Sequence, residues 1–200
     1  MTHPSPRFAW TDETEMRSFV RETAFAQIVA LVDGRLLSAQ APLSFDAAGS
    51  PCFHLALGNP LTRRLDRAPV LASVIGTHFY VSPDWYGTAD QVPTWNYRLV
   101  EMEGIARRLD AAETRAQLDQ LSADQEARLA PKPAWTTGKM DKTKLAALER
   151  GIAGFAIDAP IFRGAAKLGQ NKSDAEAAGA IEGLRAIGAY DAAAAMADAR

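Results

Sequence analysis

Apolar and polar residues alternate along the chain with two different periods, and the first region has the period of a helix. Met16 and Val20 recur at helical spacing, and Asp12 stands three residues before Glu15, the arrangement of a helix cap. These signals predict a helix over residues 12–24.

The next region is a short, almost wholly apolar run over residues 25–32 that ends at an Asp-Gly pair. Asp33 and Gly34 suit a type I′ turn because both of its central positions need a positive φ. The pattern therefore predicts a β-hairpin whose return strand covers residues 35–41. Pro42 cannot donate to a ladder, so we expect this strand to lie at an edge or to be bulged from there onward.

The remaining elements follow from similar signals. Asn59 followed by Pro60 predicts an N-cap and a first helical position, and Gly104 predicts a bulge within a long strand. Strands are expected over 52–57, 70–75 continuing through 77–82, 95–109 and 154–163, and helices over 59–67, 110–129, 141–150, 171–187 and 191–197. Because short turns mostly replace long crossover helices, the sequence favours an antiparallel barrel or sandwich, mainly β with α (α+β).

Length and composition describe a soluble, globular chain. Its 200 residues suit one domain or two small ones, and we expect a single domain over 1–200, with a flexible N-terminus at 1–10 and a helical C-terminal extension at 173–200. The formal net charge of -2 argues against a large nucleic-acid-binding surface, and direct DNA binding stays open. The single cysteine, Cys52, fits a reducing compartment, and no signal peptide or membrane span is indicated, so we expect a cytoplasmic protein.

An aromatic and polar stretch at residues 77–97 is the strongest candidate for a binding site. Large flat apolar faces beside a few hydrogen-bonding groups suit a pocket for a planar ligand with polar edges. The candidate residues are His78, Tyr80, Ser82, Trp85, Thr94, Trp95 and Asn96. The same aromatics are also typical of a core or a dimer interface, and His78 is also typical of a structural histidine.

A second candidate segment, residues 167–172, joins the last predicted strand to the tail helix. Lys167, Gln170, Asn171 and Lys172 can ligate a phosphate or the edge of a heterocycle, and a nearby helix N-terminus adds backbone donors. A solvated surface with helix caps is the alternative for the same residues.

Other kinds of site are poorly supported. His3, His54 and His78 are far apart and show none of the spacings of a zinc site, so we expect no metal. The chain has no G-x-S-x-G, no P-loop and no G-x-G-x-x-G after a strand, and Cys52 fits a buried structural thiol. The helices expected within 110–150 are separated by a proline-rich connection instead of the tight turn of a helix-turn-helix.

The two candidate segments together resemble a known family. The motifs are His78–Tyr86 (HFYVSPDWY), Val92–Tyr97 (VPTWNY), Gly154–Ile157 (GFAI) and Lys167–Lys172 (KLGQNK). In order and spacing they resemble the PaiB-type FMN-binding negative transcriptional regulators, from about Phe8 to Leu184. The resemblance implies an antiparallel FMN-binding split β-barrel with peripheral helices, related to pyridoxamine-phosphate-oxidase-like flavoproteins, that forms a homodimer and holds flavin at the subunit interface.

The resemblance also implies roles for the candidate residues. Trp85, Trp95 and Tyr80 would supply apolar or stacking surface for the isoalloxazine, and Lys167 with Lys172 would neutralise the phosphate. Hydrogen bonds to the pyrimidine edge or the ribityl chain would come from Ser82, Thr94, Asn96, Gln170 and Asn171. His78, also in the expected cofactor-binding set, is the one candidate general acid or base beside these aromatics.

Two other functions stay open on the same fold. One is a flavin-dependent oxidoreductase or flavin reductase, which would reduce its flavin with NADH or NADPH and pass electrons to an acceptor. The other is a dimeric interaction protein that has lost the flavin.

The chain departs from the family's pattern at two positions. Gln40 stands where the family usually carries a histidine, and Leu57 stands where it commonly carries an arginine. An arginine at position 57 would be a natural phosphate ligand. Arg63, Arg64 and Lys167 are the cations that could replace it.

Overall fold

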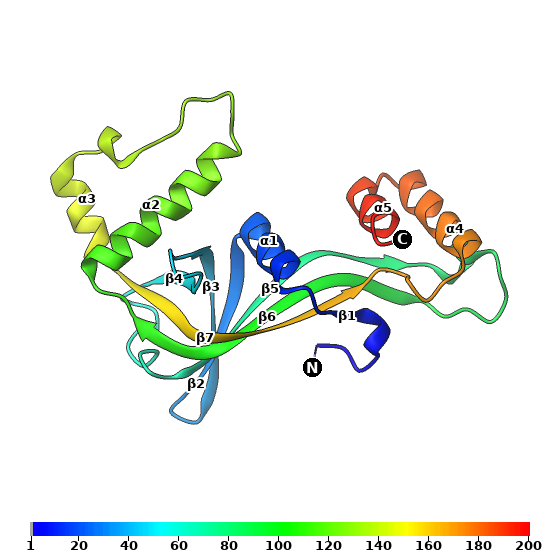
Figure 1. The fold of residues 1–200 in the computed structure, drawn as a ribbon, viewed down its shortest axis with the longest axis horizontal. Helices are drawn as coiled ribbons and strands as arrows, with labels where there is room; N and C mark the ends of the chain where they lie inside the picture. The colour runs from blue at the N-terminus through cyan, green and yellow to red at the C-terminus, as the bar shows by residue number, and fades with distance from the viewer. Residues whose placement is uncertain (1) are drawn as a thin grey trace. The chain divides into compact units, whose positions relative to one another are not determined.

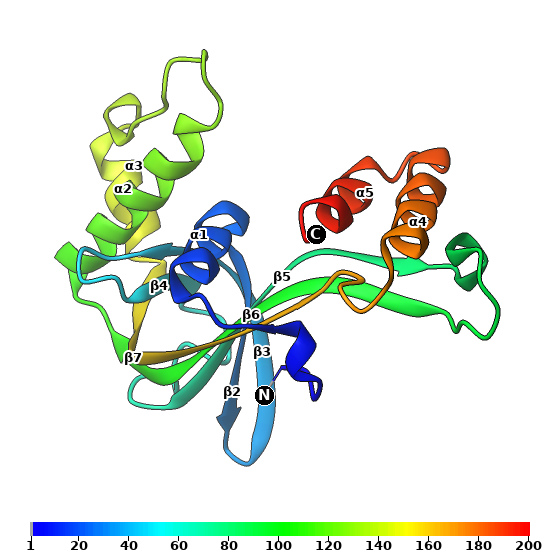
Figure 2. The ribbon, with the colours of Figure 1, turned by 45° about the vertical axis from the view of Figure 1, so that its right-hand side comes forward.

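The computed structural model describes residues 2–200 and shows an α+β protein built on one antiparallel sheet (Figures 1 and 2). The strands are β1 (Ala9–Trp10), β2 (Phe25–Val32), β3 (Arg35–Phe45), β4 (Pro51–Ala56), β5 (Pro69–Val81), β6 (Thr94–Arg108) and β7 (Ile152–Lys167). The helices are α1 (Glu13–Thr23), α2 (Ala111–Ala127), α3 (Lys142–Glu149), α4 (Asp174–Ala186) and α5 (Tyr190–Ala197), with short 3₁₀ turns η1 (Pro6–Phe8), η2 (Pro83–Tyr86) and η3 (Thr137–Lys139). The expected fold class is confirmed. Within residues 2–200, every helix is too short or too polar to span a bilayer.

The chain divides into two compact units. Unit 1 comprises the described residues up to 16 together with 75–100 and 163–200, and unit 2 comprises 17–74 and 101–162. Strands β5, β6 and β7 contribute residues to both units. The expectation of a single domain stays a prediction.

Unit 2 holds a sheet that closes on itself. The strand order is β7-β4-β3-β2-β5-β6, and β7 pairs with β6 as well, which returns the sheet to its first strand. Inside it, Phe53 and Phe155 are fully buried, with ring centroids 5.6 Å apart. Gly104 allows the closure because a Cβ there would lie 2.6 Å from the carbonyl oxygen of Asp158 on β7. The glycine expected as a bulge thus serves a close approach of two strands.

The first helix and hairpin agree with the sequence. Helix α1 begins beside Asp12, whose Oδ1 accepts a hydrogen bond from the backbone N–H of Glu15 at 3.0 Å. The turn between β2 and β3 has φ of 49° at Asp33 and 76° at Gly34. Local chemistry alone decides both features, so a sequence pattern is enough to find them.

The expected effect of Pro42 on the return strand is wrong. Strand β3 continues through it to Phe45 and lies inside the sheet, between β2 and β4. Pro42 stands opposite Phe25, the first residue of β2, and from Leu43 onward β3 pairs with β4 instead. The missing N–H therefore falls where the strand changes partner, at a point where the ladder with β2 ends.

The short helix expected over 59–67 is also wrong, because this segment forms consecutive turns. The N-cap itself is present, since Asn59 Oδ1 accepts from the N–H of Leu61 at 3.0 Å. The following backbone bonds span three residues instead of four, as from Thr62 to Asn59. Leu61, Thr62 and Leu65 are all buried, so packing into unit 2 overrides the helical signal.

Unit 1 contains the N-terminal segment and the two C-terminal helices. The terminus expected to be flexible forms η1 and β1, and β1 pairs with β7 through Ala9 and Ala165. Helices α4 and α5 lie over the parts of β5 and β6 that belong to this unit (Figures 1 and 2). Their shared core contains Phe79, Val81, Leu168, Leu184 and Met196, all buried.

Candidate functional site

Unit 1 contains a small cavity of about 230 Å³. It brings together five of the residues expected to bind a ligand: Thr94, Asn96, Lys167, Asn171 and Lys172. The other residues that line it are His3, Phe8, Tyr86, Val92 and Gly169.

Three short pieces of chain place these side chains. Thr94 and Asn96 are two residues apart on β6, so both point to the same face of the strand. Lys167 is the last residue of β7, and Gly169 then turns the chain with a φ of +85°. A left-handed φ favours glycine, and it directs Asn171 and Lys172 back to the cavity.

The two lysines of the cavity are hydrogen-bonded to neutral partners. Lys167 Nζ donates to Thr94 Oγ1 at 2.6 Å, and Lys172 Nζ donates to Gln91 Oε1. Lys172 Nζ also lies 4.1 Å from the ring centroid of Tyr86. Among residues 2–200, no carboxylate oxygen lies within ion-pair distance of either ammonium group. Neither lysine is therefore in a direct ion pair, and the charge of Lys172 acts at longer range on the carboxylate of Glu176, whose pKa it helps to lower.

Asn96 is a buried polar residue of the cavity with an unsatisfied hydrogen-bond donor. Its side chain is 1% exposed, and its Nδ2 finds no hydrogen-bond acceptor within the described chain. A buried donor without a partner costs about 1–3 kcal/mol, and native structures contain few of them. Nδ2 is thus available for an acceptor that the chain itself does not provide.

The N-terminus of α4, directly after Lys172, is already occupied. Ser173 and Glu176 form a capping box there, and hydrogen bonds from Ser173 are the main cause that lowers the pKa of Glu176. Glu176 Oε1 also accepts from Thr88 Oγ1 and Gln91 Nε2, both at 2.9 Å. Gln91 thus links Glu176 to Lys172, and an anion in the cavity would be held by the lysines instead of the helix end.

Three predicted aromatic or histidine residues form a separate, exposed group. The ring centroid of Trp95 lies 6.4 Å from that of His78 and 6.3 Å from that of Tyr80. Trp95 is 57% exposed and Tyr80 46%. Because Trp95 neighbours Asn96 on β6, its side chain points to the opposite face of the strand. The structure therefore separates these rings from the cavity within one chain.

The remaining predicted residues make local contacts. Ser82 Oγ accepts from the N–H of Asp84 and caps η2. Gln170 accepts from the N–H of Leu168 and donates to the carbonyl of Ala166, at 2.8 and 2.7 Å. Trp85 packs with the hydrophobic core of α4 and α5. None of the three lines the cavity, and their expected roles toward a ligand stay predictions.

Several cavity residues were missed from the sequence. His3 and Phe8 belong to the terminus that was expected to be flexible. Gln91, which does not line the cavity but accepts a hydrogen bond from Lys172, lies in a loop without a motif. Gly169 is the one with a usable signal, because a glycine between a strand and a helix commonly marks a left-handed turn.

The positions that depart from the family's pattern lie in unit 2. Leu57 is 39% exposed there, and Arg64 is paired at 3.8 Å with Asp33 on the surface. Of the three cations that could replace an arginine at position 57, Lys167 is the one that lines the cavity of unit 1.

Comparisons with known proteins agree with this architecture. Residues 2–160 match the model of the family described as "Putative FMN-binding domain". The chain is 31% identical over 182 residues, 89% of this chain and 86% of the relative, to the "Protease synthase and sporulation protein PAI 2" of Bacillus subtilis (strain 168).

Solved structures with a similar fold include two with flavin-related names. One is the FAD and heme binding protein from Mycobacterium smegmatis, with a TM-score of 0.60, 17% identity, and coverage of 85% of this chain and 78% of that one. The other is the flavocytochrome Anf3 from Azotobacter vinelandii, with a TM-score of 0.60, 15% identity, and coverage of 88% and 78%. At these identities the likeness concerns the fold.

Proposed function

The chain belongs to the PaiB-type family of FMN-binding domains, and we propose that the cavity of unit 1 receives the phosphate end of its FMN. The observation that carries the proposal is the buried Nδ2 of Asn96, which lacks an acceptor beside two lysines that form no direct ion pair. A dianionic phosphate and the oxygens of a ribityl chain are the acceptors that such donors require.

The donor set of the cavity fits this part of the cofactor. Lys167 and Lys172 would contact the phosphate, and Asn96 would donate to an oxygen of the phosphate or of the ribityl chain. Thr94 and Asn171 supply further polar atoms. When bound, FMN supplies one- and two-electron redox chemistry, while the protein binds and orients it.

The size of the cavity limits what it can hold. Its 230 Å³ lie below the range of about 300–1,000 Å³ that is typical of small-molecule sites. We therefore assign it the phosphate end, and the isoalloxazine would lie outside it, against another surface.

A second copy of the chain is the proposed source of that surface. Trp95 and Tyr80 expose large aromatic side chains together with His78, and aromatics are enriched at protein interfaces. In this homodimer the exposed rings of one protomer would cover flavin held by its partner.

Regulation belongs to the same proposal. The Bacillus relative is named for protease synthesis and sporulation, and a cytoplasmic flavoprotein that changes gene expression is the corresponding role here. Reduction of bound flavin by NADH or NADPH with turnover would instead favour the oxidoreductase.

The test is an FMN titration of the wild-type protein and of Asn96→Leu, followed by flavin fluorescence. We expect saturable binding at micromolar FMN by the wild type and an affinity about tenfold lower for the variant, which loses one donor. The matched control, Gln120→Leu, removes an exposed amide of α2 in unit 2 that does not line the cavity, and it should bind FMN as the wild type does.

A second readout separates a lost ligand contact from a damaged fold. Without FMN, Asn96→Leu should unfold at a higher temperature than the wild type, because it removes an unpaired buried donor. Unchanged FMN affinity in this variant, or no saturable binding by the wild type, would contradict the proposal.

A further inference from the structure

The N-terminal segment, residues 2–10, forms one wall of the cavity of unit 1. It contributes His3 and Phe8 to the lining. The side chains assigned above to the phosphate come from β6, from the end of β7 and from the turn that follows it. The N-terminal segment therefore adds groups to the cavity that this assignment leaves unused.

Contacts with β7 hold both ends of the N-terminal segment in place. β1 pairs with β7 through Trp10 and Gly164, and Thr2 Oγ1 donates a hydrogen bond to the carbonyl oxygen of Gly164 at 2.9 Å. Between these two points Phe8 is buried, with 7% of its surface exposed. Residues 2–10 thus form a loop that is closed against one strand, and this closure gives their side chains a defined place at the cavity.

Phe8 connects His3 with the cationic side of the cavity. The rings of His3 and Phe8 meet edge to face, with centroids 4.8 Å apart and an interplanar angle of 88°. The ammonium nitrogen of Lys167 lies 6.0 Å from the centroid of the Phe8 ring. The imidazole of His3 is therefore held by a ring that also lies near one of the two lysines proposed for the phosphate.

A hydrogen bond from Ser5 decides which nitrogen of His3 carries the proton. The backbone N–H of Ser5 donates to Nδ1 of His3 at 3.0 Å. A ring nitrogen that accepts a hydrogen bond carries no proton, so the proton of the neutral imidazole is on Nε2. Within residues 2–200, Nε2 makes no hydrogen bond to another group of the chain. His3 thus brings a free N–H donor to the lining of the cavity.

We infer that His3 is a further ligand of the phosphate and donates a hydrogen bond to it through Nε2–H. The inference rests on the proposed function, because it requires the phosphate end of FMN in this cavity. A terminal phosphate offers three strong acceptor oxygens, so it can accept from His3 as well as from Lys167 and Lys172. The bond from Ser5 and the contact with Phe8 orient the imidazole before a ligand arrives, which lowers the cost of ordering it on binding.

Two substitutions at position 3 separate the two nitrogens of the ring. His3→Asn keeps an acceptor near the position of Nδ1 for the N–H of Ser5 and removes the donor at Nε2. It should weaken FMN binding about tenfold, because one hydrogen bond to a charged group is lost, and leave riboflavin affinity nearly unchanged. His3→Gln places an amide N–H near the position of Nε2 and should bind FMN more tightly than His3→Asn does.

Flavin fluorescence titrations of the full-length protein measure these affinities. The matched control is Arg7→Asn in the same segment, since Arg7 is exposed and does not line the cavity. It should bind FMN and riboflavin as the wild type does.

Nitrogen-15 NMR of the imidazole tests the tautomer without any flavin. At alkaline pH the His3 signals, assigned by their absence from the spectrum of His3→Asn, should show the proton on Nε2. Addition of FMN should shift the Nε2 signal, and addition of riboflavin should not.

The outcomes distinguish this inference from the proposed function. If the wild type binds FMN while His3→Asn binds it equally well, or if the proton is on Nδ1, the inference is overturned and the proposed function stands. An equal loss of FMN and riboflavin affinity in His3→Asn would give His3 a structural role and would also overturn the inference. Absence of saturable FMN binding by the wild type would overturn both.

Discussion

The helix pair α4–α5 and the helix pair α2–α3 differ both in composition and in packing. Alanine makes up 10 of the 21 residues of α4 and α5 and 7 of the 25 residues of α2 and α3. Helices α4 and α5 bury seven residues between them: Ala177, Ala180, Leu184, Ala192, Ala193, Ala195 and Met196. Helices α2 and α3 bury one, Gln117. The pair that is richer in alanine is therefore the more closely packed one.

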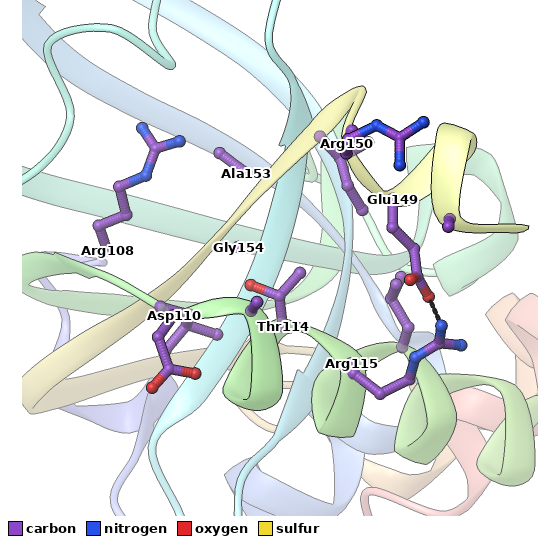
Figure 3. Close-up of a pocket in the computed structure, with 13 residues that line it drawn as sticks. Arg108, Asp110, Thr114, Arg115, Glu149, Arg150, Ala153 and Gly154 are labelled. Carbon is purple, nitrogen blue, oxygen red and sulfur yellow. Dashed lines mark ion pairs between the residues drawn. The ribbon is translucent and has the colours of Figure 1, made fainter.

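Two glycines explain how closely α4 packs against η2. Gly179 and Gly183 of α4 face Trp85 of η2, and a Cβ at either position would collide with it. Helices α2 and α3 carry no glycine within their bounds. Lys172, which lines a small cavity, comes shortly before α4, while α2 and α3 line part of a cavity of about 480 Å³ (Figure 3).

The largest expected difference is between two leucines, one in each pair. Leu184→Ala should lower the free energy of unfolding by about 2–5 kcal/mol, because Leu184 is 1% exposed and its loss leaves a cavity. Leu148→Ala, its control in α3, should change it by no more than about 0.5 kcal/mol, since Leu148 is 57% exposed. Urea denaturation measures both. Equal costs would show that the two helix pairs are packed alike.

The glycine contacts can be separated by a double-mutant cycle. Gly179→Ala should destabilise by about 1–3 kcal/mol whether or not Trp85 is also changed to Ala, because its Cβ would meet the backbone oxygen of Trp85. Gly183→Ala would meet the indole ring, so its cost should vanish in the Trp85→Ala background. Thermal unfolding of the variants measures the coupling, and equal behaviour of the two glycines would contradict this geometry.

Lys172, which precedes α4, should allow the protein to distinguish FMN from riboflavin. Lys172→Gln should weaken FMN binding about tenfold and leave riboflavin affinity nearly unchanged, because riboflavin has no phosphate. Lys144→Gln in α3 is the control, since Lys144 is exposed and does not line the cavity of unit 1. Flavin fluorescence titrations give the four affinities. A parallel loss of both flavins would place Lys172 away from the phosphate.

The smallest expected effect concerns the hydrogen bond between His54 of β4 and Gln117 of α2. His54 Nδ1 lies 3.1 Å from Gln117 Oε1, and burial lowers the pKa of His54 below its ordinary value of 6.5. As the pH falls below about 6.5, His54 is therefore protonated in the unfolded chain before it is protonated in the folded protein. The free energy of unfolding should consequently decrease as the pH falls below that value. His54→Asn should flatten this part of the curve of unfolding free energy against pH. A slope unchanged by the substitution would show that other groups cause it.

Features decided by neighbouring residues could be predicted from the sequence. The Asp33-Gly34 turn, the Asp12 cap and the long alternation of β6 depend on local backbone chemistry, and the structure confirms them. The path of β3 through Pro42 could not be predicted, because it depends on which strand lies on either side. The turns after Asn59 depend in the same way on burial of Leu61 and Leu65.

In the candidate site, too, features decided by local sequence could be predicted and features decided by tertiary contacts could not. Thr94, Asn96, Lys167 and Lys172 were found by residue type and spacing, and they meet in one cavity. The separation of Trp95 from Asn96 follows from strand alternation and could have been drawn from the sequence. His3, by contrast, lines the cavity in a structure where β1 pairs with β7, and no local sequence pattern predicts that pairing.

The chain passes between unit 1 and unit 2 four times, at residues 16–17, 74–75, 100–101 and 162–163. No single cut in the gene could therefore release either unit as one continuous piece, and recombination would have to transfer the two together. During synthesis on the ribosome, unit 2 has all of its residues once position 162 has emerged, while unit 1 still awaits 163–200. The lysines of the cavity are among the later residues to be made, so a nascent chain would acquire its closed sheet before the cavity that we propose for the phosphate.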